Sequence, residues 1–451
     1  MDKNVAMEYN SVITDKNVVM KHNSVITDKN AVMKYNSVVA DFVEEVAGMI
    51  DRPLYIDQII PLVDKDPVKV LVGFRRSGKS ILLDLIKQYL LDNGRQEQQF
   101  ISMNFEDFAF YDYRDAKSMH DYIKSQITNK SKKTYLFLDE IQEVDGFEMA
   151  LNSLRVSENV DIYITGSNSN LLSGELATYL AGRYFQIFVY PFSFKEYVAA
   201  KSAIEASRLD ELFLAYVQEG GMPFVVVENL PRRTKDNYLK DIYNSVILKD
   251  IIERNRIRDV ELLERVIQFS FSNIGQIFSA TGIAKYLKSQ SRQGKTDTLL
   301  NYLGYCKDAF LLYPLKRHDL RGKRIFSTNE KYYVVDHGLR EAMLGKNSND
   351  IQQVLENIIA LEAIRRGYTV TVGYVGEFEI DFVLERGSEK AYVQVTYLLT
   401  SDNTIEREFR PLLEVKDNYR KIVVSLDPIL QPRAGIEHMR IENFLLEDYW
   451  T

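Results

Sequence analysis

The chain has 451 residues, of which 45% are hydrophobic and 27% charged, and this ordinary globular composition leaves room for about two to four domains. Its net charge of −7 argues against a non-specific nucleic-acid coat protein, and its single cysteine, Cys306, excludes an intrachain disulfide. No apolar leader opens the sequence, and the longest uncharged stretch, Val266 to Ala284, is too polar to span a membrane, so we expect a cytoplasmic protein without a membrane segment.

The N-terminal region is repetitive. Residues 2–40 consist of three tandem copies of a 13-residue unit, beginning at Asp2, Asp15 and Asp28. This period is neither a heptad nor a solenoid repeat, and each copy carries few apolar residues. We expect residues 1–40 to be a mobile leader without a core of its own; the alternative is an arm that pairs with a partner or with a sheet edge.

Residues 41–199 alternate between apolar runs and helical patterns. Because strands that alternate with helices build parallel sheets, this region predicts an α/β fold with a mostly parallel sheet. The five predicted strands are Val68–Gly73, Phe100–Phe105, Thr134–Leu138, Asp161–Thr165 and Phe185–Val189.

The first strand leads into a G-x-x-x-x-G-K-[ST] motif, and a helical pattern follows it. The N–H groups of such a loop and the start of its helix form a cradle for phosphate. Lys79 is then expected to reach the β- and γ-phosphates of ATP, and the Ser80 hydroxyl to bind Mg²⁺. The alternative is a chance match in a loop that starts a helix. The residues predicted to contact nucleotide are Gly73, Arg75, Arg76, Ser77, Gly78, Lys79, Ser80 and Ile81.

Polar residues end the third and fourth strands. Asp139 is placed to support the Mg²⁺ shell, and Glu140 to polarise the water that attacks the γ-phosphate. Ser167 or Asn168, at the tip of a strand between those carrying the phosphate loop and Glu140, is expected to contact both γ-phosphate and water. The alternative for this Gly-Ser-Asn segment is a turn chosen for its backbone tolerance.

These motifs resemble those of AAA+ ATPases. The narrower resemblance is to a prokaryotic AAA_14-type family that opens with GxRRxGKS, carries an hhhhDEIQ box and has a C-terminal DUF4143 domain. In such ATPases an arginine after the sensor strand reaches the γ-phosphate of a neighbouring subunit, and Arg183 occupies that place. The resemblance therefore implies a homo-oligomer with Arg183 acting in trans; a surface helix cap is the alternative. The matching segments are Gly73–Ser80, Leu136–Gln142, Leu171–Gly174, Leu180–Arg183, Tyr190–Tyr197 and Gly220–Pro223.

The next two regions are predicted to be a helical lid, residues 200–255, and a winged helix, residues 256–345. Between Thr281 and Glu330 there are ten Lys or Arg residues and four Asp or Glu residues, a local charge of +6. Duplex DNA is therefore the expected partner, and docking of a protein is the alternative. The candidate phosphate contacts are Lys285, Lys288, Arg292, Lys295, Arg317, Arg321, Lys323 and Arg324.

Residues 346–451 resemble the PD-(D/E)XK nuclease fold. Glu356 and Asp381 match two of its metal-binding acids, but Gln394 stands where the fold has a glutamate, and Thr396 stands where it has the catalytic lysine. The loss of both charges predicts a degenerate domain that binds rather than cuts. Lys390 and Arg407 are the candidates for a spatial substitute for the missing lysine.

Together these patterns predict an AAA+ ATPase that uses ATP and Mg²⁺ and is coupled to DNA or to a protein partner. Two alternatives stay open. One is an ATP-regulated, metal-dependent nuclease with metal at Glu356 and Asp381. The other is a slow signalling or scaffold ATPase that does not bind DNA.

Overall fold

The computed structural model describes residues 19–21, 24–26, 50–167, 180, 182–202, 208–289, 294–322, 324–345 and 350–451. The chain forms two compact units, Met1–Asp51 and Arg52–Thr451. In the first unit, β1 (Val19–Lys21) and β2 (Ser24–Ile26) form an antiparallel pair within the second 13-residue repeat. The rest of the repeats lies outside the described residues, so the expectation of a mobile leader stays a prediction.

A five-stranded, fully parallel sheet begins the second unit, with the strand order β4-β5-β6-β3-β7. This confirms the predicted parallel α/β sheet, and β6 lies between β5 and β3 as expected. The strands are β3 (Val68–Val72), β4 (Phe100–Asn104), β5 (Thr134–Asp139), β6 (Val160–Gly166) and β7 (Tyr184–Phe188).

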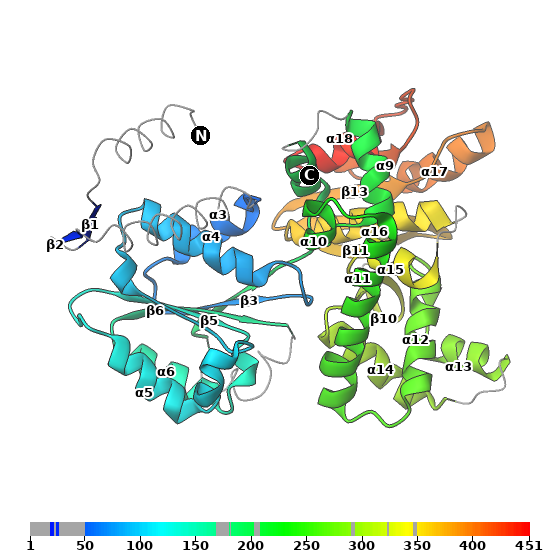
Figure 1. Ribbon diagram of the computed structural model, residues 1–451. Coiled ribbons are helices and arrows are strands. Elements are labelled where there is room, and N and C mark those ends of the chain that lie inside the picture. Colours follow the sequence, from blue (N-terminus) through cyan, green and yellow to red (C-terminus); the bar gives the residue numbers. More distant parts are fainter. Residues whose placement is uncertain are drawn as a thin grey trace. The chain divides into compact units, whose positions relative to one another are not determined.

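Both faces of this sheet are covered, because its central strands are apolar on both sides. In β3, Val70 belongs to one buried cluster, which also includes residues of α5 and α6, whereas Leu71 belongs to another with α3 and α4. Figure 1 shows these two helix pairs on opposite faces of the sheet. The helices are α3 (Pro53–Ile59), α4 (Lys79–Asp92), α5 (Ala116–Gln126) and α6 (Phe147–Ser157), with short 3-10 segments η1 (Ile60–Leu62), η2 (Glu97–Gln99), η3 (Phe108–Tyr113) and η4 (Ile141–Glu143).

The region predicted to be a lid is helical. Its turn at Gly221 contacts both later and earlier parts of the chain: the Gly221 N–H donates to Asp336 Oδ2 at 2.7 Å, and a Cβ at this position would lie 2.2 Å from the Phe192 carbonyl oxygen. Only glycine permits so close an approach. The helices are α8 (Phe194–Ser202), α9 (Leu209–Glu219), α10 (Pro223–Val227), α11 (Arg232–Ser245) and a π-helix, η6 (Val246–Glu253).

The next region has the element order α12-β8-α13-α14-β9-β10-α15. Strand β10 pairs antiparallel with both β8 and β9. Arg317 to Asp319 belong to β9 and pair with Val372 to Tyr374, so the loop between β9 and β10 is short. The elements are α12 (Val260–Ser272), β8 (Ile277–Phe278), α13 (Ala280–Ser289), α14 (Thr296–Asp308), β9 (Leu312–Asp319), β10 (Arg324–Val334) and α15 (His337–Leu344).

The C-terminal strands extend this hairpin into one eight-stranded mixed sheet, ordered β15-β14-β13-β12-β11-β9-β10-β8. The predicted boundary at residue 345 therefore falls within the span of a single sheet. Helix α16 contacts β10 through β13, and α17 contacts β12 through β14. The remaining elements are α16 (Ile351–Arg365), β11 (Thr369–Val375), β12 (Phe378–Arg386), β13 (Glu389–Val395), α17 (Asp402–Glu414), β14 (Arg420–Ser425), β15 (Glu437–Arg440) and α18 (Ile441–Leu446).

No helix in the part of the chain that the structure describes has both the length and the apolar character needed to cross a membrane.

Candidate active site

The loop from Gly73 to Ser80 connects the carboxyl end of β3 to the first turn of α4, which is the strand–loop–helix context predicted from the motif. Two glycines are required by its geometry. A Cβ on Gly73 would lie 2.1 Å from the Val189 carbonyl oxygen, and Gly78 has a left-handed φ of 92° directly before α4. The loop can therefore turn tightly and present its N–H groups at the start of a helix, where anions bind.

Lys79 is buried beneath this loop. Its Nζ donates to the carbonyl oxygens of Gly73 at 3.2 Å and Phe74 at 3.3 Å, and lies 3.9 Å from Glu140 Oε1. Burial lowers the pKa of Lys79, and the neighbouring Glu140 charge opposes this effect. The ammonium therefore lies between the phosphate loop and the end of β5.

Asp139 ends the buried strand β5, Glu140 follows it, and the Thr165 hydroxyl connects both residues to β6. Thr165 Oγ1 accepts from the Glu140 N–H at 2.8 Å and donates to Asp139 Oδ1. Glu140 has a left-handed φ of 51°, a strained conformation for a residue other than glycine that is concentrated at functional sites. Burial raises the pKa of Glu140, while Lys79 and the Gln142 amide that donates to Oε2 act against the rise.

Ser167 is the polar side chain that directly follows β6. Ser167 is buried, and its Oγ lies 3.5 Å from Asp250 Oδ1 in η6. The other predicted candidate in this strand tip, Asn168, lies outside the described residues. The choice between the two as γ-phosphate contact therefore stays a prediction.

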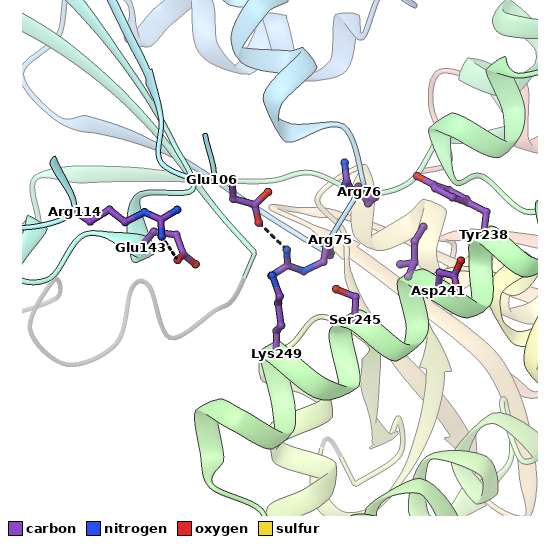
Figure 2. A pocket seen from close by; sticks show the side chains of 10 residues that line it. Arg75, Arg76, Glu106, Arg114, Glu143, Tyr238, Asp241, Ser245 and Lys249 are labelled. Carbon is purple, nitrogen blue, oxygen red and sulfur yellow. Dashed lines mark hydrogen bonds and ion pairs between the residues drawn. The ribbon is translucent and has the colours of Figure 1, made fainter. Parts of the chain in front are cut away.

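The two loop arginines differ in their surroundings. Arg75 makes a bidentate pair with Asp250, with Nε–Oδ2 and Nη2–Oδ1 distances of 3.0 Å, and its Nη1 donates to Glu106 at 3.1 Å. Arg76 is exposed and has a φ of 64°. Both line a cavity of about 470 Å³ between the phosphate loop and the helical segment α11–η6 (Figure 2). The cavity is further lined by Glu106, Arg114, Glu143, Tyr238, Asp241, Ile242, Ser245 and Lys249.

Arg52 also supports the loop, although the sequence marks it only as the residue before Pro53. Its buried guanidinium donates to the Ser77 carbonyl oxygen at 3.0 Å, to the Tyr190 carbonyl oxygen at 2.8 Å and to Glu196 Oε1 at 2.7 Å. One side chain thus joins the phosphate loop to the segment that follows β7. No local pattern could have identified it, because its partners are 25 to 144 residues away.

The residues at the start of α4 fit Mg²⁺ bound together with a nucleotide. Within the described ranges, no group of three or more His, Cys, Asp or Glu residues could hold a metal ion by itself. Mg²⁺ at phosphate sites needs only one or two protein oxygens, because phosphates and waters complete its shell. Ser80, which is exposed at the helix start, and Asp139 match that requirement. Ser77 Oγ is buried with no hydrogen-bond partner among the described residues, as expected of a donor left for a ligand. Ile81, next in α4, is 43% exposed.

Arg183 does not lie at the phosphate loop of its own chain. Its carbonyl oxygen accepts from the Val68 N–H at 2.9 Å, at the amino end of β3, whereas the phosphate loop follows the carboxyl end of that strand. Its side chain is exposed. A role for Arg183 in a neighbouring subunit stays a prediction.

Glu356 and Asp381 are brought together in the C-terminal sheet around a buried lysine. Lys331 Nζ lies 2.7 Å from Glu379 Oε1, 3.6 Å from Glu356 Oε2 and 3.9 Å from Asp381 Oδ1. Tyr333 also donates to Glu356 Oε2, at 3.2 Å. Burial raises the pKa of both Glu356 and Asp381, and the Lys331 charge opposes the rise.

Neither predicted substitute for the missing lysine reaches this cluster. Lys390 pairs with Glu385 at 3.0 Å, and Arg407 pairs with Glu408 at 2.6 Å. The ammonium comes instead from Lys331 in β10, because β10 and β12 belong to one sheet beneath α16. Gln394 Oε1 accepts from the Asp381 N–H at 3.3 Å, so this residue serves the cluster as a neutral acceptor.

Comparisons with known protein families agree with the description of the phosphate-loop region. Residues 65–198 match a family model described as an AAA domain, and residues 210–350 match a domain of unknown function, DUF8612. The C-terminal DUF4143 domain that the sequence resemblance implies is not confirmed by these matches. The nuclease-like assignment of residues 346–451 therefore stays a prediction.

Whole-length relatives are also found. An uncharacterized protein of Methanocaldococcus jannaschii is 29% identical over 432 residues, 88% of this chain and 94% of that protein. The solved structure of a Walker-type ATPase of Pyrococcus abyssi is 16% identical with a TM-score of 0.46, covering 65% of this chain and 96% of that one. An uncharacterized protein of Haemophilus influenzae is 41% identical over 401 residues, 88% of this chain and 99% of that protein. The chain therefore belongs to the family of the Haemophilus influenzae protein, and its residues 65–198 form an AAA-type ATPase domain.

Proposed function

We propose that the chain hydrolyses ATP with Mg²⁺ and couples this reaction to duplex DNA or to a protein bound there. One observation carries the proposal: Lys79, at the start of α4 after the glycine loop, and Glu140, directly after β5, face each other at 3.9 Å. A phosphate on that loop and a water beside Glu140 would have the arrangement that phosphoryl transfer needs.

Each described residue has a distinct part in this proposal. Loop N–H groups and Lys79 bind the phosphates, and Ser80 and Asp139 hold Mg²⁺, which supplies charge neutralisation to the phosphate oxygens. Glu140 accepts the proton of the attacking water. Its raised pKa brings its basicity closer to neutral pH, where a general base is most effective.

Steady-state ATP hydrolysis by Glu140→Gln tests this assignment, with Glu143→Gln as the matched control. Glu143 is an exposed acid three residues away that lies 4.0 Å from Arg114. We expect kcat of Glu140→Gln to fall about 100-fold or more and that of Glu143→Gln to stay within about twofold. Equal turnover by the wild type and Glu140→Gln would remove Glu140 as the base.

The region from α12 to β10 supports a DNA-binding winged helix. Its order of helices and strands, with β10 lying between β8 and β9, is compatible with such a fold. Lys285, Lys288 and Lys295 are exposed on α13 and at the start of α14. Exposed lysines along one helix can follow a phosphate backbone.

Other members of the predicted basic set are engaged inside the chain. The Arg317 guanidinium stacks 4.4 Å from the Tyr374 ring centre, and Arg321 pairs with Glu414 at 3.4 Å. Arg292 and Lys323 lie outside the described residues, as does the side chain of Arg324. We therefore propose that Lys285 and Lys288 of α13, rather than Arg317 and Arg321 of the hairpin, bind the DNA phosphates.

Fluorescence anisotropy with a labelled duplex at several salt concentrations tests this surface. Lys285→Glu/Lys288→Glu should weaken binding about tenfold or more and reduce its salt dependence, whereas Lys87→Glu, on α4, should not. No duplex binding by the wild type at low salt would favour a protein partner or the scaffold alternative.

Arg183 is proposed to complete the site of a neighbouring subunit. ATP turnover per chain would then rise with protein concentration, and Arg183→Ala would abolish the rise. A specific activity that is independent of concentration would contradict an in-trans role.

The nuclease alternative has one observation in its favour, because Lys331 supplies an ammonium beside Glu356 and Asp381. We nevertheless propose binding rather than cutting, since this ammonium occupies the space between the carboxylates where a metal would lie. Incubation of DNA with Mg²⁺ or Mn²⁺, with and without ATP, decides between them. Metal-dependent cleavage that is lost in Asp381→Asn would establish the nuclease.

A further inference from the structure

Asp250 lies in η6 and contacts both the phosphate loop and the residue that follows β6. Both of its oxygens accept from Arg75 at 3.0 Å, and Oδ1 also lies 3.5 Å from Ser167 Oγ. Arg75 and Asp250 are 175 residues apart in sequence, and both side chains are largely buried. This single carboxylate therefore links η6 to Arg75, a predicted nucleotide contact, and to Ser167, a predicted γ-phosphate contact.

Arg75 lies within electrostatic reach of the proposed catalytic groups. Burial works to lower the pKa of Arg75, but its hydrogen bonds to Asp250 and the charges of Asp250, Glu140 and Glu106 raise it. The Arg75 charge in turn contributes to lowering the pKa of Lys79. Figure 2 shows the Arg75 side chain extending from the loop toward Glu106 and the α11–η6 helix.

A guanidinium binds carboxylate and phosphate with the same pair of parallel N–H donors. The donors that Arg75 gives to Asp250 are thus the ones that a γ-phosphate oxygen would require. A diphosphate lacks that group and would leave the pair with Asp250 undisturbed.

We infer that Asp250 is a positioning residue that holds Arg75 on η6, and that the γ-phosphate of bound ATP competes with Asp250 for the Arg75 guanidinium. The inference rests on the proposed function, because it requires a triphosphate on the loop. If so, the Arg75–Asp250 contact is broken with ATP and kept with ADP, and η6 responds differently to the two nucleotides.

The π-helical conformation of η6 is consistent with a role in responding to the nucleotide. It is a π-helix of eight residues, Val246–Glu253, continuous with α11. Such segments depart from regular α-helical hydrogen bonding and are frequent at functional sites. Release of Asp250 from Arg75 would change the contacts of η6 while leaving its buried Val246, Ile247 and Ile251 in the apolar core.

Isothermal titration of the full chain with ATPγS and with ADP, in Mg²⁺, tests the inference through the ratio of the two affinities. Asp250→Asn keeps the shape of the side chain but removes its charge. Freed from Asp250, Arg75 should bind the γ-phosphate more strongly, so the preference for ATPγS over ADP should rise about tenfold, the value of one charge-assisted hydrogen bond. Asp250→Glu should restore most of the original ratio.

Two further variants separate positioning from a structural effect. In Arg75→Ala/Asp250→Asn the rise should disappear, because the group that Asp250 positions is absent. Asp241→Asn removes an exposed carboxylate from the wall of the cavity that Arg75 lines, and it should change the ratio less than about twofold. Thermal unfolding of each variant verifies that it is folded.

The outcomes distinguish the inference from the proposal beneath it. Nucleotide binding with the same ATPγS-to-ADP ratio in the wild type and Asp250→Asn would overturn the role of Asp250 alone. Equal weakening of both nucleotides would also overturn it, since that is the signature of a structural residue. No binding of either nucleotide to the wild type would overturn the proposed function and this inference with it.

Discussion

Among the buried lysines of the described residues, Lys79 and Lys331 have opposite surroundings. Lys79 contacts two backbone carbonyl oxygens and approaches one carboxylate no closer than 3.9 Å. Lys331 lies within 3.9 Å of three carboxylates, the nearest at 2.7 Å. Burial lowers the pKa of Lys79, whereas the surrounding negative charges outweigh burial and raise the pKa of Lys331 well above its usual value.

The difference indicates which site is available to a ligand. Around Lys79, the buried Ser77 hydroxyl has no partner in the described structure, and Glu140 is held in a strained conformation. Around Lys331, Tyr333 donates to Glu356, and the Val395 N–H donates to Asp381 at 2.8 Å. The first arrangement leaves donors for phosphate, whereas the donors of the second are engaged by carboxylates of the protein.

Lys331→Met should therefore have the largest effect on stability. It leaves Glu356 and Asp381 buried without their counter-charge, which costs about 3–5 kcal/mol of unfolding free energy. Chemical denaturation measures the loss, with Lys316→Met on the exposed side of the adjacent strand β9 as control. A loss below about 1 kcal/mol would show that the cluster is open to water or to another cation.

The destabilisation of Lys331→Met should also depend on pH. Without the ammonium, burial raises the pKa of Glu356 and Asp381 further above the unfolded value. Carboxyls with a raised folded-state pKa lose stability as pH rises from the unfolded pKa, about 4, toward the folded one. The difference from the wild type should be smaller at pH 5 than at pH 8. An equal loss at both pH values would contradict this account of the cluster.

At the nucleotide site, Ser80→Ala should act on the metal rather than on the fold. Removing the hydroxyl should raise the Mg²⁺ concentration needed for half-maximal ATP turnover by about tenfold, because one of few protein ligands is lost. EDTA should abolish turnover in both proteins. Titration of Mg²⁺ at fixed ATP measures the shift, and an unchanged Mg²⁺ dependence would remove Ser80 from the metal shell.

Lys79→Met should have the smallest effect on stability. Its loss removes a desolvated charge whose described partners are mainly carbonyl oxygens, so the unfolding free energy should change by about 1 kcal/mol or less. Chemical denaturation of Lys79→Met and Lys331→Met under the same conditions compares their unfolding free energies directly. Equal losses in the two variants would show that both lysines are structural.

The AAA domain, residues 65–198, was predictable because its sequence signals are local. Each of the five strands begins and ends within one residue of its predicted bounds, since an apolar run between turn residues marks a buried parallel strand. The phosphate loop and Asp139-Glu140 carry their chemistry in adjacent residues. Their meeting follows from the shared carboxyl edge of a parallel sheet.

The contacts that could not be predicted from the sequence join segments that are far apart in the chain. Asp250 is an unremarkable acid in a helical pattern until the fold brings it to Arg75, and Arg52 reaches Ser77 only across the core. In the sequence, nothing distinguishes Lys331 from any other lysine in a hairpin strand. Pairing between β9 and β11 makes that hairpin part of the C-terminal sheet, and no period in the sequence specifies this register.

Binding of Mg·ATP to the wild type and to Lys79→Met, measured by thermal unfolding and titration calorimetry, tests the central claim most directly. The wild type should be stabilised by about 2.7 kcal/mol when free nucleotide is about 100 times Kd, and the folded variant should gain little. Stabilisation of both proteins to the same extent, or of neither, would contradict a triphosphate site built on the loop from Gly73 to Ser80.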